Sequence, residues 1–148
     1  MRQFSAAGVL GFAMIVLVSC HSAAPGTITV YKSPTCGCCV KWIDHLEAGG
    51  LTVEAIDVED VAWIKKENGV PAQLSSCHTA LVDGYVIEGH VPVEDVLRLI
   101  EERPDVIGLA VPEMPIGSPG MEGPHPEAYE VIAFTKDGST HTYASHGP

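Results

Sequence analysis

The pattern of hydrophobic and polar residues predicts a strand and then a helix in the first part of the chain. Residues 27–31 alternate and are mostly β-branched, which is typical of a strand. The next apolar residues recur at positions i, i+3, i+4 and i+7, which is the spacing of one buried helix face, and Gly49 and Gly50 end this helix. The face consists of Cys39, Trp42, Ile43 and Leu46.

Strand and helix patterns recur further along the chain. Residues 51–58 predict a second strand, and the short helix after it ends at the 68–71 turn. Asp83 and Gly84 lie between two short apolar runs, an arrangement that is typical of a β-hairpin. Residues 79–88 therefore predict two antiparallel strands.

A third helix is predicted from Pro92 until Pro104, again with apolar residues at helical spacing. The order of elements up to this point is βαβαββα, which indicates an α/β fold. Residues 108–126 are rich in glycine and proline, which predicts an irregular loop that wraps the domain. A terminal β-hairpin is predicted over residues 129–143.

The first residues of the chain predict export. Arg2 precedes an apolar run over residues 6–18, which is too short to span a bilayer and is typical of a secretory signal. The run leads to Cys20 in a string that resembles a bacterial lipobox, whose cysteine is lipidated; a plain signal peptide cleaved near Ala23 or Ala24 is the alternative. The protein is therefore expected in the bacterial cell envelope, facing the periplasm, with a lipid at Cys20 as its membrane attachment.

The length and the net charge of the chain limit the number of domains and the classes of partner that can be expected. The part after the leader has the length of one domain with its own core. The net charge of -11 at pH 7 excludes nucleic acid as a partner. The expected segments are a signal peptide with lipobox at 1–20, a tether at 21–26, the main domain at 27–104 and a C-terminal extension wrapping the same domain at 105–148.

Three cysteines lie within one turn at the expected start of the first helix. Cys36 and Cys39 have the spacing of a dithiol pair, in which one thiolate attacks and the other resolves. Cys38 has no role in such a pair, and a third thiolate suits a soft metal ion that several sulfurs share. A thiol-disulfide oxidoreductase with Cys36 and Cys39 as catalytic residues, and a protein with purely structural disulfides, are the alternatives.

The soft character of the candidate ligands indicates which metal ion the protein would bind. Thiolates select Cu(I) and zinc over hard ions. Four-cysteine zinc sites usually have two separated pairs, whereas this chain has three clustered cysteines plus Cys77, so a multinuclear Cu(I) site is expected and zinc is the rival. Met114 and Met121 add soft thioethers within the 108–126 segment, with His125 close behind, although methionines also serve as core residues.

The element order, with thiols at the first junction between strand and helix, resembles the thioredoxin fold. In that fold a cis-proline packs against the cysteines, and aligning the hairpins places Cys77, His78 and Thr79 there. Because proline is absent, a trans peptide is expected, and the resemblance implies that His78 faces the cysteine turn as a potential ligand. His90 is weighed equally as a ligand and as a polar loop residue, and His45 is expected to be a solvated helix residue.

Longer strings resemble the CopG family of bacterial envelope proteins associated with copper resistance. The family implies a thioredoxin-like domain that holds copper with its cysteines, a nearby histidine and a C-terminal extension. The matching strings are 34–39, Trp42 with His45-Leu46, 69–71, 76–80, 88–92, 108–112, Met114-Pro115 and 117–121.

The expected function is to sequester Cu(I), or to interconvert Cu(I) and Cu(II), in metal resistance. The expected partners are copper ions and other periplasmic copper-handling proteins, and whether the protein also acts as an enzyme is left open. The candidate metal ligands are Cys36, Cys38, Cys39, Cys77, His78, His90, Met114, Met121 and His125.

Overall fold

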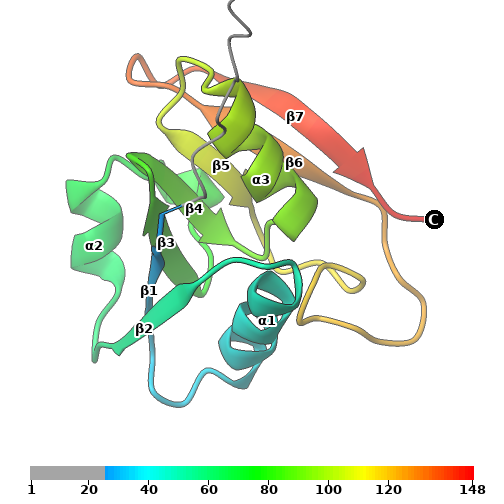
Figure 1. Ribbon diagram of the computed structural model, residues 1–148. Helices are drawn as coiled ribbons and strands as arrows, with labels where there is room; N and C mark the ends of the chain where they lie inside the picture. Colours follow the sequence, from blue (N-terminus) through cyan, green and yellow to red (C-terminus); the bar gives the residue numbers. More distant parts are fainter. Residues whose placement is uncertain (1–25) are drawn as a thin grey trace, which may run out of the picture.

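One seven-stranded sheet forms the frame of the protein in the computed structural model, which describes residues 26–148 (Figure 1). The strand order is β2-β1-β3-β4-β5-β6-β7, so β2 and β7 are the edge strands. The predicted leader, most of the tether and the lipidation of Cys20 lie outside the described residues. The strands are β1 (Ile28–Lys32), β2 (Val53–Asp57), β3 (His78–Val82), β4 (Tyr85–Gly89), β5 (Gly108–Val111), β6 (Tyr129–Phe134) and β7 (Thr140–His146).

Three α-helices connect the first strands in the predicted order. They are α1 (Gly37–Ala48), α2 (Ala62–Glu67) and α3 (Val93–Glu102), and a short 3-10 helix, Ala72–Leu74, precedes β3. The mixed α/β class is confirmed, and so is the βαβαββα order of the first seven major elements. None of the helices in the described part has the length and apolar character that crossing a membrane requires.

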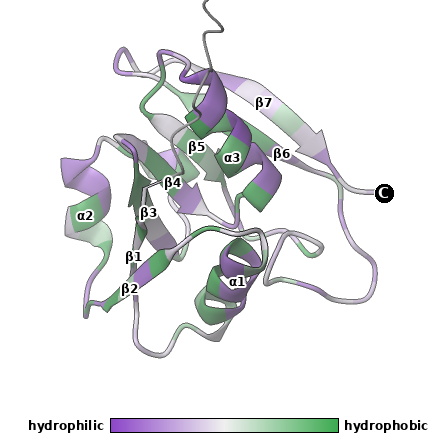
Figure 2. Cartoon of the chain, in the orientation of Figure 1, coloured by the Kyte–Doolittle hydropathy of each residue, from purple (hydrophilic) through white to green (hydrophobic). Residues whose placement is uncertain are grey.

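The sheet is packed on both faces, because alternate residues of its central strands point in opposite directions. One face of the sheet packs against α1 and α3, whose hydrophobic sides turn inward (Figure 2). Its cluster includes Trp42, Leu46, Ala80, Val82, Ile87, Val96 and Leu99. The opposite face carries a smaller cluster of Leu74, Val86, Ala110 and Phe134.

The prediction of irregular structure is wrong for Gly108–Val111, which forms β5. This strand pairs in parallel with β4 and antiparallel with β6, and all four of its residues are buried. A Cβ atom on Gly108 would lie 1.8 Å from the carbonyl oxygen of Val86, so only glycine allows this approach. The predicted terminal hairpin exists as β6 and β7, and these strands extend the sheet.

The segment between β5 and β6 passes over the beginning of α1. A Cβ atom on Gly120 would lie 2.8 Å from the carbonyl oxygen of Cys38 and 3.0 Å from the amide nitrogen of Trp42. Gly120 has a φ of +85°, which other residues rarely adopt. The segment therefore covers the helix end where the cysteines lie.

Candidate metal centre

Four sulfur atoms meet at the start of α1. A disulfide joins Cys36 and Cys39, while Cys38 and Cys77 are free thiols. The Sγ atom of Cys38 lies 3.5 Å from that of Cys36, and the Sγ atom of Cys77 lies 3.5 Å from that of Cys39. All four Sγ atoms lie within 4.8 Å of one another. Each end of the disulfide thus has one free thiol beside it.

Strand pairing brings Cys77 to the other three cysteines. Strand β1 pairs antiparallel with β3, and Lys32, the last residue of β1, lies opposite His78. The chain leaves β1 through a short turn into α1, and Cys36 occupies the N-cap position of that helix. Cys77 immediately precedes β3, so the two thiol-bearing junctions meet at one end of the β1–β3 ladder.

Two buried histidines lie on the other side of Cys77. Its Sγ atom is 3.3 Å from Nδ1 of His78 and 3.1 Å from Nε2 of His90. These three ligand atoms form a second group within 4.8 Å, and both imidazoles are fully buried. Cys77 belongs to both groups and therefore connects the sulfur-rich part of the centre to its imidazole part.

The tautomer of His90 is defined by the segment that covers α1. Nδ1 of His90 lies 2.7 Å from the carbonyl oxygen of Pro119. Because a carbonyl only accepts hydrogen bonds, Nδ1 carries the proton, and Nε2 presents its lone pair toward Cys77. Metal-binding histidines usually have this arrangement, in which the second ring nitrogen donates to a carbonyl or carboxylate.

Packing holds the ring of His78. Its centroid lies 4.2 Å from that of Trp42 and 5.2 Å from that of His90. The indole is itself fixed, since its Nε1 donates a 2.8 Å hydrogen bond to the carbonyl of Val91. Nε2 of His78 is buried with no hydrogen-bond partner in the described part of the chain. The peptide bond before His78 is trans, as expected.

Burial shifts the pKa values of Cys77, His78 and His90 in the direction that disfavours their charged forms. Burial raises the pKa of Cys77 to about 12, and the neighbouring Cys38 adds to the rise. Burial also lowers the pKa of His78 and of His90, and for His90 the Pro119 carbonyl partly opposes the shift. At neutral pH the imidazoles are neutral and ready to bind a metal, whereas Cys77 must release a proton.

These shifts predict that stability falls at both ends of the pH range. Below the ordinary histidine pKa of 6.5, the unfolded chain binds protons before His78 and His90 do, so the free energy of unfolding decreases as the pH falls. Above the ordinary cysteine pKa of 9.0, the unfolded chain loses the Cys77 proton first, so stability decreases toward pH 12. Each uncompensated proton contributes a slope of at most about 1.4 kcal/mol per pH unit.

Urea unfolding of the metal-free oxidised protein at a series of pH values checks this expectation. The variant Cys77→Ser should lose the additional alkaline decline and keep the acidic one. A wild-type protein whose free energy of unfolding stayed constant from pH 7 to pH 5 would contradict buried, neutral histidines.

A buried ion pair, which the sequence did not reveal, supports the Cys77 segment from behind. The carboxylate of Glu88 is fully buried and accepts hydrogen bonds from Nζ of Lys65 (2.5 Å), the amide of Ser76 (2.6 Å) and the hydroxyl of Thr79 (2.7 Å). Lys65 comes from α2, which lies on the other side of β1 and β3 from α1 (Figure 1). The only signal was a glutamate that ends an otherwise apolar run in the hairpin.

The expectation of a solvated His45 is wrong. Its Nε2 atom accepts a 3.0 Å hydrogen bond from the amide of Val93, the first residue of α3. The amides at the start of a helix lack partners within the helix, and Pro92 at the N-cap position makes no side-chain cap. His45 supplies the missing acceptor and connects the two helices that flank the centre.

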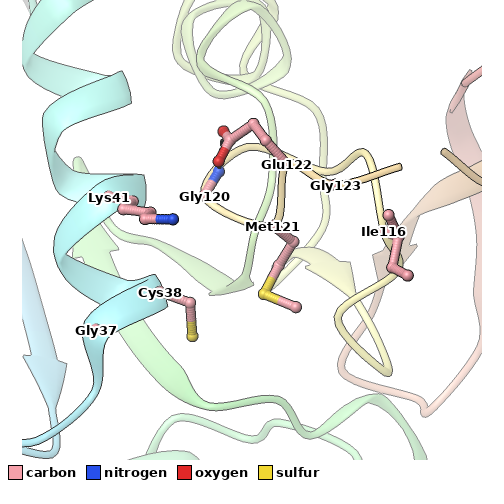
Figure 3. A pocket seen from close by; sticks show the side chains of 8 residues that line it. All are labelled: Gly37, Cys38, Lys41, Ile116, Gly120, Met121, Glu122 and Gly123. Atoms are coloured by element: carbon pink, nitrogen blue, oxygen red, sulfur yellow. Dashed lines mark hydrogen bonds between the residues drawn. The ribbon is translucent and has the colours of Figure 1, made fainter. Parts of the chain in front are cut away.

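The structure separates the three more distant ligand candidates. The half-buried Met121 lines a pocket together with Cys38, and Figure 3 shows both side chains extending into the same space. Met114 lines a different pocket, with Tyr129 and Ile132. His125 is exposed and belongs to neither group of closely spaced ligand atoms. Met121 is thus the candidate that lines a pocket together with one of the three clustered cysteines.

Comparisons with known proteins point to copper resistance. A family model described as "Protein of unknown function, DUF411" matches residues 74–121. Two solved structures, "Copper resistance protein copG- Form 2" and "Form 1", are 45% and 44% identical to this chain, both with a TM-score of 0.79. Each match covers 84% of this chain and 100% of the solved chain. A search of curated proteins found no match.

Proposed function

The chain belongs to the CopG family of copper resistance proteins, and from this premise we propose that its cysteine and histidine cluster binds copper. The observation that carries the proposal is the presence of four sulfur atoms within 4.8 Å of one another, with two buried imidazoles beside Cys77. Thiolates and imidazoles are the ligands that copper prefers in proteins.

The four cysteines of the centre favour copper in the Cu(I) state. They also favour the binding of more than one ion. Reduction of the Cys36–Cys39 disulfide makes four thiolates available in one small volume. Crowded thiolates bridge soft ions readily, and Cys38 has no role in a simple redox pair. We infer that the reduced protein sequesters Cu(I) in a multinuclear cluster, with Cys36, Cys38, Cys39 and Cys77 as ligands.

The imidazole part supports interconversion of Cu(I) and Cu(II). Cys77, His78 and His90 form a mixed nitrogen and sulfur set, which also suits Cu(II). Both histidines are neutral at pH 7 because burial lowers their pKa. Cys77 joins this set to the other three cysteines. The centre therefore has ligands for both oxidation states of copper. In this proposal His90 is a ligand and the Pro119 carbonyl orients it.

Anaerobic titration of the reduced chain with Cu(I) tests the proposal. Every variant carries Cys20→Ser, so that the thiols come only from Cys36, Cys38, Cys39 and Cys77. We expect more than one Cu(I) per chain, and Cys38→Ser should lower this number. Val40→Ser, on the same helix and 46% exposed, is the matched control and should bind as many ions as the wild type. A wild-type chain that bound at most one Cu(I), or that preferred zinc, would contradict the proposal.

The disulfide favours a second candidate function, that of a thiol-disulfide oxidoreductase. It joins Cys36 and Cys39, which have the spacing of a dithiol redox pair, and Cys36 is the more exposed of the two. An assay of protein disulfide reduction separates the two functions. If Cys38→Ser left copper binding unchanged while Cys36→Ser and Cys39→Ser abolished reductase activity, the oxidoreductase function would replace copper binding.

We also propose an envelope location and a thioredoxin-like core. The element order and the β1, β3 and β4 pairing support a thioredoxin-like unit over residues 27–104, with 105–148 extending it. An experimental structure whose α1 and β3 failed to superpose on a thioredoxin would contradict that fold.

For the location, the lipobox-like string at Cys20 supports a lipid attachment that faces the periplasm, where other copper-handling proteins would be its partners. Cys20→Ser should release the protein from the membrane fraction or leave its precursor unprocessed. A wild-type mature N-terminus beyond Cys20 would contradict this anchor.

A further inference from the structure

A pocket of about 470 Å³ opens beside the free thiol of Cys38. It lies between the first turn of α1 and the segment 116–123 (Figure 3). Both Cys38 and Met121 line it, and both side chains are half-buried. The pocket therefore presents a thiol and a thioether, two soft ligands, to a space that opens to solvent.

The backbone around Met121 is held in place. The amide of Met121 donates a 2.9 Å hydrogen bond to the carbonyl of Ser118, and its own carbonyl accepts a 3.0 Å bond from the amide of Gly117. Gly120, one residue earlier, approaches the backbone of α1 so closely that an added Cβ would lie 2.8 Å from the Cys38 carbonyl oxygen. The segment that carries the thioether is thus fixed against the helix turn that carries the thiol.

The disulfide divides the ligands of the centre into two sets. With Cys36 and Cys39 bonded to each other, neither offers a thiolate, and the two remaining thiols lie beside opposite ends of the disulfide. Cys77 contacts the two buried histidines, whereas Cys38 lines the pocket with Met121. The oxidised protein therefore retains an inner set with imidazoles and an outer set with a thioether.

We propose that Cys38 and Met121 form an outer Cu(I) site that operates while Cys36 and Cys39 are joined as a disulfide. This inference rests on the proposed copper function. It identifies the two residues that contact the Cu(I) ion first. The Cys38 thiol releases its proton to solvent, its sulfur and the Met121 sulfur bind the ion, and copper stays Cu(I) throughout. Thiolate and thioether ligands both suit Cu(I), which tolerates low coordination numbers.

Reduction of the disulfide then connects the outer site to the cluster. A dithiol reductant supplies two electrons and two protons to Cys36 and Cys39 and itself becomes a disulfide. The sulfur of Cys36, 3.5 Å from that of Cys38, becomes a thiol that exchanges its proton for a share of the bound ion. The ion passes inward by exchange of ligands, without a change of its oxidation state.

The test isolates the outer site in the oxidised full chain. Cys20→Ser and Cys77→Ser are present in all variants, so that Cys38 is the one free thiol once the Cys36–Cys39 disulfide is verified by peptide mass. Cu(I) is supplied anaerobically from a weak chelator. We expect one ion per chain, and Met121→Leu should weaken its affinity about tenfold or more. Met114→Leu, the matched methionine control from the other pocket, should leave the affinity unchanged.

Alkylation of Cys38 provides a second readout. Cu(I) should slow the reaction of Cys38 with iodoacetamide in the background protein, and it should slow the reaction less in Met121→Leu. If Met121→Leu does not fold, Cys38→Ala in the same background replaces it and should abolish the bound ion. Equal affinities of the Met121→Leu and Met114→Leu proteins, or no Cu(I) binding by the oxidised background protein, would overturn the outer site.

The reduced chain separates this inference from the proposed function. If reduced wild type binds several Cu(I) ions while the oxidised background protein shows no dependence on Met121, only the outer site fails. If reduced wild type also binds no Cu(I), the copper function itself fails.

Discussion

Replacing Cys77 by serine is expected to weaken Cu(I) binding by the reduced protein at least about 100-fold. Cys77 is the residue shared by both ligand groups, since its sulfur lies 3.5 Å from Sγ of Cys39 and 3.1 Å from Nε2 of His90. Loss of residues that only orient metal ligands already costs about 10- to 100-fold in affinity, and loss of a shared ligand should exceed that. A serine hydroxyl is also a hard, neutral group that Cu(I) does not favour.

Competition against a Cu(I) chelator of known affinity measures this effect. The exposed neighbour Ser75, replaced by alanine, is the matched control and should bind copper as the wild type does. His90→Ala should have an intermediate effect, because it removes one imidazole and leaves the thiols. A Cys77→Ser protein with affinity within about threefold of the wild type would show that the copper centre is not built around this residue.

The largest expected effect on stability comes from Lys65→Met, which should lower the free energy of unfolding by about 3–5 kcal/mol. The substitution removes the ammonium group 2.5 Å from the Glu88 carboxylate and leaves a charge in a fully buried position. The two remaining hydrogen bonds to Glu88, from Ser76 and Thr79, do not neutralise it. Because Ser76 adjoins Cys77, the damage should also reach the candidate copper ligands.

Chemical unfolding of the metal-free protein checks this prediction. Lys66→Met is the matched control, since Lys66 follows on the same helix but is exposed, and its effect should stay within about 0.5 kcal/mol. The double variant Lys65→Met with Glu88→Gln should recover much of the loss, because a neutral amide oxygen still accepts the Ser76 hydrogen bond without a buried charge. A double variant no more stable than Lys65→Met alone would contradict an electrostatic cause.

Local patterns were sufficient to predict the first half of the fold. The helical spacing of Trp42 and Leu46 predicted the buried face of α1, and Asp83-Gly84 predicted the hairpin of β3 and β4. Strand β5 was missed because it has only four residues and adjoins a segment dense in glycine and proline. Its strand conformation depends on pairing with β4 and β6, which no local pattern encodes.

The clustering of the sulfur atoms was largely predictable from the sequence, whereas the surroundings of the candidate site were less so. Three clustered cysteines are visible in the sequence, whereas the place of Cys77 came from resemblance to a fold. Met114 and Met121 have the same chemistry and lie in the same segment, so only the path of the chain separates them. The partners of His45 and Lys65 are distant in sequence, and long-range contacts of this kind leave no periodic signal.

The contact between His90 and Pro119 has a consequence for the order of events during folding. The candidate copper ligands begin at Cys36, yet the carbonyl that orients His90 belongs to Pro119, which is 29 positions further along the chain than His90. Because a chain is synthesised from its N-terminus, Cys36 and Cys77 emerge before Pro119 does. A newly emerging chain thus carries its thiols without the oriented imidazole. Full orientation of the candidate copper ligands is therefore a property of the completed fold.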